Sequence, residues 1–214
     1  MKELGTISKI EAQKNNQERC SIFVDGDFLL GVKAELIYEF DLDKGEVLTE
    51  STLMELLKQE ELLEAKKAAF NLLSYRQRSR KELKERLLRK DYKKQIVETV
   101  INILERLDYL DDKEFALSWV KDRITKGFGP YRIREQLREK GIANKIIEEA
   151  LTKEYDSQLE YDLAKKLATK KKSRYSDKDY RERKYKLSKV LERKGFSFEV
   201  INLVLDDLLE KGDF

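Results

Sequence analysis

The chain has 214 residues, of which 41% are charged and 40% hydrophobic, and its formal net charge is +3. This mix is too apolar for a disordered polyelectrolyte and is typical of long amphipathic helices. Histidine is absent and Cys20 is the single cysteine, which excludes Cys/His zinc sites, histidine-based catalysis and an intrachain disulfide. Catalysis by carboxylates or lysine alone stays open, but nothing in the sequence argues for it. We therefore expect no enzyme, no metal and no cofactor.

The location follows from the same composition. A lone cysteine indicates a reducing cytoplasm. No stretch approaches the roughly 18 uninterrupted apolar residues of a membrane span, and the first ten residues lack the apolar core of a secretory signal. We expect a cytoplasmic monomer without membrane contact.

The first third of the chain is rich in β-branched and apolar residues. Thr6–Ala12, Cys20–Val24 and Phe28–Val32 are predicted strands. Asp25-Gly26 between the last two is a favoured two-residue hairpin turn. The pattern predicts a three-stranded antiparallel meander, followed by a short helix around Ala34–Phe40.

From about residue 61 onward the sequence is helical in period. Thr49 is the predicted cap of a helix that starts before this point. The next three predicted helices cover Ala65–Tyr75, Ser79–Lys90 and Lys93–Leu107. Ser79 and Glu82 have the spacing of a capping box.

Further signals mark the later helices. Asp111 is an acidic cap, and Pro130 stands at a first helical position, where its missing amide costs little. Ser176 is the predicted cap of a helix that ends at Lys194.

Three stretches of the chain align without a gap in eight positions. The aligned positions are Leu83, Leu87, Lys90, Tyr92, Ile96, Val97, Val100 and Ile101, then Ile133, Leu137, Lys140, Ile142, Ile146, Ile147, Ala150 and Leu151, then Leu187, Leu191, Lys194, Phe196, Val200, Ile201, Val204 and Leu205. Gly141 and Gly195 follow the later two lysines and suit left-handed helix ends, whereas the first stretch has Asp91. A repeat of this length predicts supersecondary units that bury their apolar faces against neighbours.

The fold class that follows is mainly α. We predict three tandem three-helix repeats in an elongated, curved array, preceded by the small antiparallel meander. The expected boundaries are 1–60 for the meander with its short helices, 61–110 for the first repeat, 111–155 for the second and 156–214 for the third.

Charge alternates in phase with the repeat. Residues 66–95 carry 12 basic and 3 acidic side chains, residues 120–145 carry 8 and 3, and residues 165–194 carry 14 and 4. The segments between and after them are acidic. Residues 96–119 carry 2 basic and 6 acidic side chains, residues 146–162 carry 1 and 6, and residues 195–214 carry 1 and 5. The second helix of each repeat is therefore basic and the third acidic.

Basic residues flank the buried rows of the second helices. A run of charge is usually only a solvated face, but separation by sign, helix by helix, favours a stripe suited to a polyanion. Binding to phosphates would then fall with salt, by about 0.7 to 0.9 log units of affinity per log unit of salt for each phosphate. The candidate partner-facing or DNA-facing residues are Arg80, Lys84, Arg89, Tyr131, Arg132, Arg134, Arg138, Lys186, Lys189 and Arg193.

Other conspicuous residues have a structural explanation. The aligned lysines Lys90, Lys140 and Lys194 suit the last turn of a helix, where a cation complements the helix dipole. Tyr92 and Trp119 lie on apolar faces and are expected in the core, whereas Tyr131 beside Pro130 is the better candidate for an exposed contact.

The motifs, in their order and spacing, resemble the RecX family of recombinase regulators. The matching runs are Arg78-Ser79-Arg80-Lys81-Glu82-Leu83 leading to Leu87 and Lys90, Tyr109-Leu110-Asp111-Asp112, Phe115-Ala116, Trp119-Val120, Gly127-Phe128-Gly129-Pro130, Ile133, Leu137 and Lys140-Gly141-Ile142. The resemblance extends from about Ala65 to the carboxyl terminus, and Asp91 departs from the glycine of the later repeats.

The resemblance implies a function that periodicity alone does not. RecX proteins bind RecA, especially its filament on single-stranded DNA, and restrain its ATPase, strand exchange and the co-protease activity of the SOS response. It therefore implies a role in DNA recombination and repair, with DNA a secondary partner. The basic helices would face acidic recombinase surface or filament DNA, and the acidic helices basic loops of neighbouring protomers. Alternatively, the acidic helices only pair with basic helices of the next repeat.

A different class of function also fits the charge pattern. Three-helix units with a basic middle helix superficially resemble DNA readers, so a stand-alone nucleic-acid-binding array is the alternative. No helix shows the Asn, Gln and Arg pattern of major-groove readout. Tight, recombinase-independent binding to DNA would favour this alternative.

Overall fold

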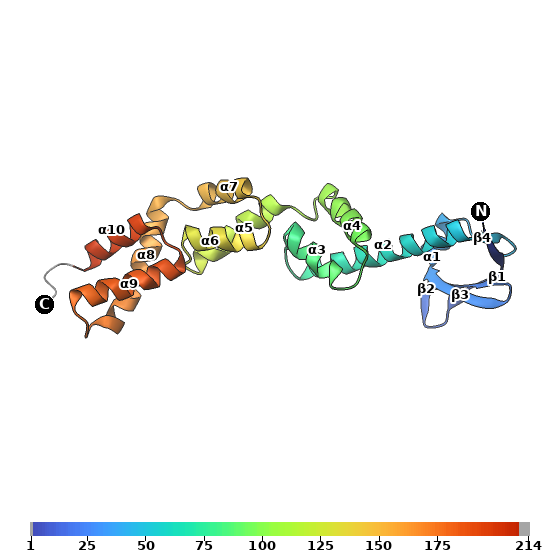
Figure 1. Ribbon diagram of the computed structural model, residues 1–214, viewed down its shortest axis with the longest axis horizontal. Coiled ribbons are helices and arrows are strands. Elements are labelled where there is room, and N and C mark those ends of the chain that lie inside the picture. Colours follow the sequence, from blue (N-terminus) through green and yellow to red (C-terminus); the bar gives the residue numbers. More distant parts are fainter. Residues whose placement is uncertain (1, 210–214) are drawn as a thin grey trace. The chain divides into compact units, whose positions relative to one another are not determined.

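The computed structural model describes residues 2–209, which form two compact bodies. The first body contains the residues up to Arg76 together with Lys84–Arg106, and the second contains Gln77–Leu83 together with the residues from Leu107 onward. A small sheet near the amino terminus is followed only by helices (Figure 1). Among residues 2–209 no helix combines the length and the apolar character that a membrane crossing requires.

The sheet has four antiparallel strands in the order β3-β2-β1-β4. They are β1 (Glu3–Gln13), β2 (Asn16–Val24), β3 (Asp27–Lys33) and β4 (Val47–Thr49). Asp25 and Gly26 both have positive φ, 50° and 97°, as the predicted hairpin turn requires. The predicted meander corresponds to β1–β3, but the prediction missed β4. Three residues show too little alternation to be recognised, and β4 pairs with β1 over a long sequence separation, with Leu48 opposite Gly5.

Two helices complete the amino-terminal part. α1 (Ala34–Glu39) connects β3 to β4. α2 (Glu50–Tyr75) is capped by Thr49, whose Oγ1 accepts a hydrogen bond from the Thr52 amide at 3.2 Å. The prediction of a separate helix over 65–75 is wrong, because α2 runs unbroken for 26 residues. No glycine or proline interrupts it.

A buried carboxylate ties α2 to the sheet. Glu60 is 8% exposed, and its side chain accepts hydrogen bonds from Arg19 Nη1 at 2.6 Å and from the Lys33 amide at 2.8 Å. Buried charges are normally paired in this way. Glu60 therefore fixes the register between α2 and the ends of β2 and β3.

Three repeats of three helices follow, as predicted. Repeat 1 contains the carboxyl-terminal part of α2, α3 (Arg80–Leu88) and α4 (Lys94–Arg106); repeat 2 contains α5 (Asp112–Thr125), α6 (Pro130–Glu139) and α7 (Asn144–Glu154); repeat 3 contains α8 (Ser157–Lys172), α9 (Tyr180–Lys194) and α10 (Phe198–Leu208). In each repeat the first and third helices pack against one another, as α2 with α4, α5 with α7 and α8 with α10. The predicted fold class of three helical repeats behind a small sheet is confirmed.

The aligned apolar positions are buried with two exceptions. Leu83, Ile133 and Leu187 are each 0% exposed, for example. Ile146 is half-buried, and so is Tyr92, whereas its counterparts Ile142 and Phe196 are each 4% exposed. The prediction that Tyr92 belongs to the core is therefore only partly confirmed.

The predicted helix starts agree with the structure at four positions, Thr49 among them, and differ at one. The side chains of Ser79 and Asp111 accept amide hydrogen bonds, and Pro130 is the first residue of α6. The prediction that Ser176 is a cap is wrong, since Asp179 caps α9 and accepts a hydrogen bond from the Glu182 amide at 2.8 Å. A cap needs an extended backbone; Asp179 has ψ 165°, whereas Ser176 has ψ −26°.

Asp91 adopts the left-handed conformation of its glycine counterparts, with φ 64° beside 80° for Gly141 and 84° for Gly195. We expect Asp91→Gly to raise the free energy of unfolding by about 0.5–1 kcal/mol, because glycine takes this conformation without a Cβ penalty. Asp91→Ala is expected to destabilise, since alanine keeps the Cβ and loses the polar side chain that helps aspartate tolerate positive φ. Chemical denaturation of both variants checks this; equal changes would contradict it.

Candidate interaction surface

Within the second body, the start of α3 contacts the end of α6, and the start of α6 contacts the end of α9. We call these two contacts the first and the second joint. In the first joint, Ser79 Oγ donates to the carbonyl of Lys140 at 2.7 Å. Lys81 Nζ donates to the carbonyl of Glu139 at 3.0 Å. These bonds satisfy carbonyl groups at the end of α6 that have no partner within the helix.

The second joint repeats this contact one repeat later, between α6 and α9. The Gly129 amide donates to the carbonyl of Lys194 at 2.8 Å, and the Tyr131 amide donates to the carbonyl of Gly195 at 3.0 Å. Gly129 aligns with Ser79, and Lys194 aligns with Lys140. Here the two backbones are so close that a Cβ on Gly129 would lie 2.3 Å from the carbonyl carbon of Gly195.

The two joints differ in charge at one aligned position. In the first, Lys140 Nζ lies 2.7 Å from Glu82 Oε1 and 4.3 Å from the centre of the Trp119 ring. In the second, Arg132 stands where Glu82 stands in the first. Lys194 Nζ lies over the Phe128 ring instead, at 4.0 Å. The second joint therefore replaces a neutralising carboxylate with a further cation.

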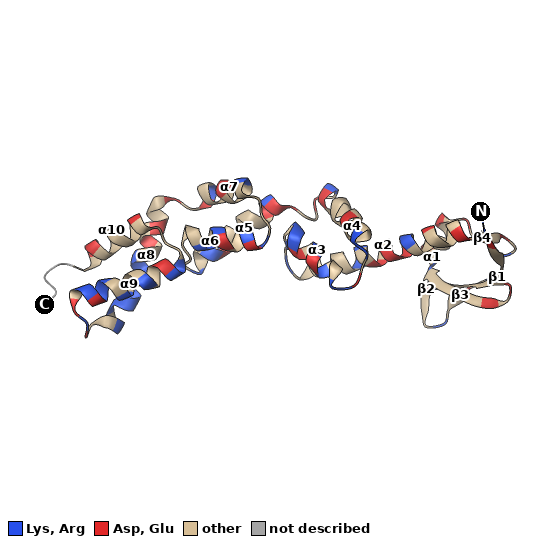
Figure 2. Cartoon of the chain, in the orientation of Figure 1, with Lys and Arg blue, Asp and Glu red and all other residues tan. Residues whose placement is uncertain are grey.

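A cleft of about 910 Å³ opens at the second joint, and we call it the junction cleft. Its cations come from three helices, namely α6 (Arg132 and Arg138), α8 (Lys171) and α9 (Arg193 and Lys194). Leu167 and Val190 form an apolar wall of the cleft. Tyr131, which is 60% exposed, also lines it. Lys and Arg are dense on α9 and on the segment before it (Figure 2).

The carboxylates of the junction cleft are already paired. Glu135 forms an ion pair with Arg132, and Glu192 accepts from Lys189 Nζ at 2.7 Å. Over residues 2–209 no carboxylate pairs with Arg138, Lys171 or Arg193. Arg138 Nε donates to the neutral Asn144 Oδ1 at 3.0 Å. The cleft thus offers uncompensated positive charge beside an exposed aromatic ring, which suits an anionic partner surface.

Two more of the predicted partner-facing cations, Arg134 and Lys84, bond to a carboxylate on the third helix of their own repeat. Arg134 Nε and Nη2 donate to the Glu148 carboxylate at 2.6 and 2.9 Å. These hydrogen bonds raise the pKa of Arg134, and they lower the pKa of Glu148. Lys84 pairs with Glu98 at the equivalent positions of repeat 1. In both pairs, a carboxylate of the acidic helix bonds to the basic helix of its own repeat.

The structure brings together four of the ten candidate residues. Tyr131, Arg132, Arg138 and Arg193 line the junction cleft. The other six lie outside it: Arg80, Lys84, Arg89, Arg134, Lys186 and Lys189. Sequence reasoning did not select Lys171 and assigned Lys194 to the helix dipole. In the alignment of the repeats, Arg132 occupies the position of Glu82. This difference in charge is the sequence feature that could have indicated that the second joint is more basic than the first.

Within the described part of the chain, His, Cys, Asp and Glu nowhere gather into a group of three or more that could hold a metal ion. Tyr155, near the cleft, has a pKa raised by burial, and its hydroxyl donates to the carbonyl of Phe128 at 3.1 Å. It holds the loop before α6 in place.

Comparison with known proteins identifies the family. Four family models match in order: the regulatory protein RecX N-terminal domain at residues 5–49, and the first, second and third three-helix domains of RecX at 65–104, 111–151 and 158–205. The chain is 35% identical to the regulatory protein RecX of Clostridioides difficile (strain 630), over 99% of each chain. It is 34% identical to that of Bacillus subtilis (strain 168), over 97% of this chain and 78% of the relative.

Solved structures give the same result. A crystal structure of regulatory protein RecX superposes with a TM-score of 0.79 and 33% identity, covering 95% of this chain and all of that one. RecX from Lactobacillus salivarius superposes with a TM-score of 0.65 and 34% identity, over 70% of this chain and 97% of that one. The chain belongs to the RecX family, and it is a regulatory protein, not an enzyme.

Proposed function

We propose that the chain binds the RecA recombinase, above all its filament on single-stranded DNA, and inhibits its ATPase, strand exchange and SOS co-protease activity. Family membership supports this partner. We further propose that it acts as a monomer in the cytoplasm, and that contact with DNA is secondary to contact with the recombinase.

One observation supports the junction cleft as the contact surface. Arg138, Lys171 and Arg193 have no carboxylate partner among residues 2–209, whereas Arg132, Arg134 and Lys189 on the same helices each form an ion pair. An acidic protein surface would supply the missing carboxylates, and Tyr131 would pack at the centre of such a contact.

A second function is favoured by a different feature of the same surface. The Arg134 guanidinium lies 5.4 Å from the centre of the exposed Tyr131 ring, which is a suitable platform for a base. A chain that used this platform would bind single-stranded nucleic acid without any recombinase.

Co-sedimentation separates the two functions. The chain is mixed with RecA filaments on single-stranded DNA, and in parallel with the same DNA alone, at physiological salt. The proposal predicts recovery of the chain in the filament pellet at concentrations where bare DNA retains little of it. Equal retention by bare DNA would instead support the nucleic-acid-binding function.

A further inference from the structure

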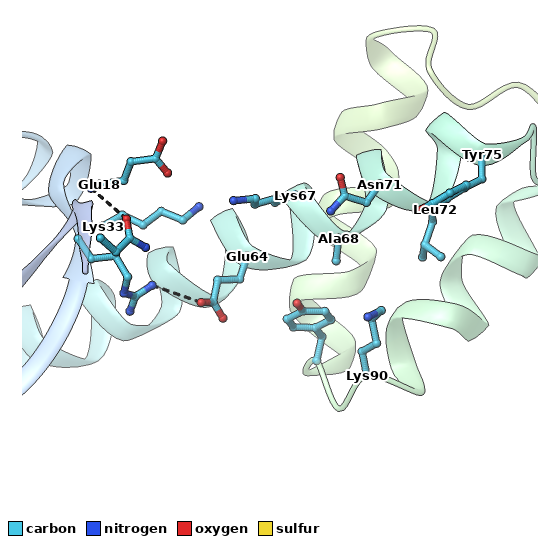
Figure 3. A pocket seen from close by; sticks show the side chains of 12 residues that line it. Glu18, Lys33, Glu64, Lys67, Ala68, Asn71, Leu72, Tyr75 and Lys90 are labelled. Atoms are coloured by element: carbon cyan, nitrogen blue, oxygen red, sulfur yellow. Dashed lines mark hydrogen bonds and ion pairs between the residues drawn. The ribbon is translucent and has the colours of Figure 1, made fainter. Parts of the chain in front are cut away.

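A second basic cleft lies wholly within the first body, and we call it the N-terminal cleft. Its volume is about 550 Å³. The helix α2 supplies one side, the ends of β2 and β3 supply another, and the connection between α3 and α4 supplies Lys90 and Tyr92 (Figure 3). Three parts of the chain that are far apart in sequence therefore converge on it.

Three lysines face this cleft with little compensation. Lys33 and Lys67 point their ammonium groups toward one another, and Lys90 reaches toward α2 (Figure 3). Lys33 Nζ lies 4.0 Å from Glu35, but no carboxylate within residues 2–209 pairs with Lys67 or Lys90. Facing like charges repel one another, and a bound anion would remove that repulsion.

The other charged groups of the cleft do not supply that anion. Glu64 lies 3.4 Å from Arg19 Nη1, which also binds Glu60 at 2.6 Å. Arg19 Nη2 donates to the carbonyl of Gly31 at 2.8 Å. Glu18 also lines the cleft, but it pairs with none of the three lysines in the described part of the chain. Lys67 and Lys90 are therefore available to an external ligand.

The repeats give an independent reason to single out Lys90. Its counterpart Lys140 pairs with Glu82 of repeat 1 at 2.7 Å, and its counterpart Lys194 lies over the Phe128 ring of repeat 2 at 4.0 Å. Both counterparts thus contact a side chain of the repeat before. Lys90 has no repeat before it, and it faces the N-terminal cleft. The position that forms a joint elsewhere is open to a ligand here.

Two tyrosines add an aromatic component. Tyr75, at the last residue of α2, is 86% exposed, so its ring face is available for stacking. Tyr92 is half-buried, and burial, followed by Glu64 and Glu61, raises the pKa of its hydroxyl. It therefore stays protonated and can donate a hydrogen bond. Lysines with an adjacent open ring are the usual elements of a single-strand binding groove.

We propose that the N-terminal cleft binds single-stranded nucleic acid, with phosphates at Lys33, Lys67 and Lys90 and a base on Tyr75. The number of contacts favours a strand over a free nucleotide. The cleft offers three lysines and an exposed ring, more than the single phosphate and single base of a nucleoside monophosphate can occupy. This site is separate from the junction cleft, and its failure would leave the proposed contact with the recombinase untouched.

The test measures the anisotropy of a fluorescein-labelled twelve-residue oligothymidylate titrated with the full chain. We expect Lys67→Ala with Lys90→Ala to weaken binding at least about tenfold and to reduce the slope of log affinity against log salt by about 1.4, since each phosphate contact contributes about 0.7. Tyr75→Ala is expected to weaken binding about fivefold or more.

Matched variants in the same body control for charge and for ring loss. Lys44→Ala with Lys94→Ala removes two exposed lysines outside the cleft, and Tyr38→Ala removes a ring that is 85% exposed. Both are expected to bind like the unmodified chain. The proposal is overturned if the control variants lose as much affinity as the cleft variants, if the cleft variants keep full affinity, or if the unmodified chain does not bind the oligonucleotide.

Competition identifies the ligand. Thymidine monophosphate, at the same concentration of nucleotide residues, is expected to displace the oligonucleotide poorly. Displacement as strong as that by unlabelled oligothymidylate would show a free-nucleotide site and overturn the assignment to a strand. Displacement by polyglutamate at equal charge would show a site for polyanions in general, and would also overturn it.

Discussion

Replacing Gly195 with alanine is expected to lower the free energy of unfolding by about 3 kcal/mol or more. Gly195 has φ 84°, and a Cβ there would lie 2.3 Å from the Arg132 amide nitrogen and 2.9 Å from its Cα. These are backbone atoms at the start of α6, so they cannot move aside as a flexible side chain can. Relief of the clash would separate α6 from α9 and break the hydrogen bonds of the second joint.

Gly127→Ala is the matched control for this variant. Gly127 also has positive φ, 67°, but a Cβ there would meet nothing within 4 Å. Its replacement should cost only the left-handed strain, about 1 kcal/mol. Denaturation is followed by the fluorescence of Trp119, the single tryptophan, which stacks on Phe115 in repeat 2. Equal destabilisation by the two variants would contradict the role of Gly195 as a close-contact residue.

Reversing two charges of the junction cleft, by Arg138→Glu with Arg193→Glu, is expected to raise the concentration for half-inhibition of the RecA ATPase at least about tenfold. Both side chains lack a carboxylate partner in the described part of the chain, so they remain available to an acidic surface. Opposed like charges at an interface cost several kcal/mol. Arg134 is left unchanged, because its bond to Glu148 would confuse loss of contact with loss of local structure.

The control reverses two exposed lysines on α7, by Lys145→Glu with Lys153→Glu. It makes the same change in net charge within the same body. Inhibition by this variant should match that of the unmodified chain. If both pairs weaken inhibition equally, the effect comes from net charge, and the junction cleft has no special role.

The sequence was sufficient for the parts of the fold that depend on local rules. The recurrence of apolar residues predicts the three repeats, and Thr49, Asp111 and Pro130 mark helix starts through cap chemistry that needs only near neighbours. Where two local signals compete, the sequence is insufficient. Ser176 and Asp179 are both acceptable caps, and the turn before α9 decides between them.

The candidate site was predicted only in part, because it depends on contacts between repeats. Helical periodicity indicates that Arg132, Arg138 and Arg193 face outward, but it does not indicate that α6 begins against the end of α9. The same long-range contact gives Lys194 its position beside Phe128. The internal bond of Arg134 to Glu148 could be suspected from the recurring spacing of 14 residues, which Lys84 and Glu98 share.

The most direct test of the proposed function is the single-stranded-DNA-dependent ATPase of RecA, titrated with this chain and repeated with excess DNA. We predict inhibition at well below one copy of the chain per recombinase, which added DNA does not relieve, because the chain acts on the filament. Inhibition that disappears as DNA is added would show that the chain only competes for the strand, and would contradict direct regulation of the recombinase.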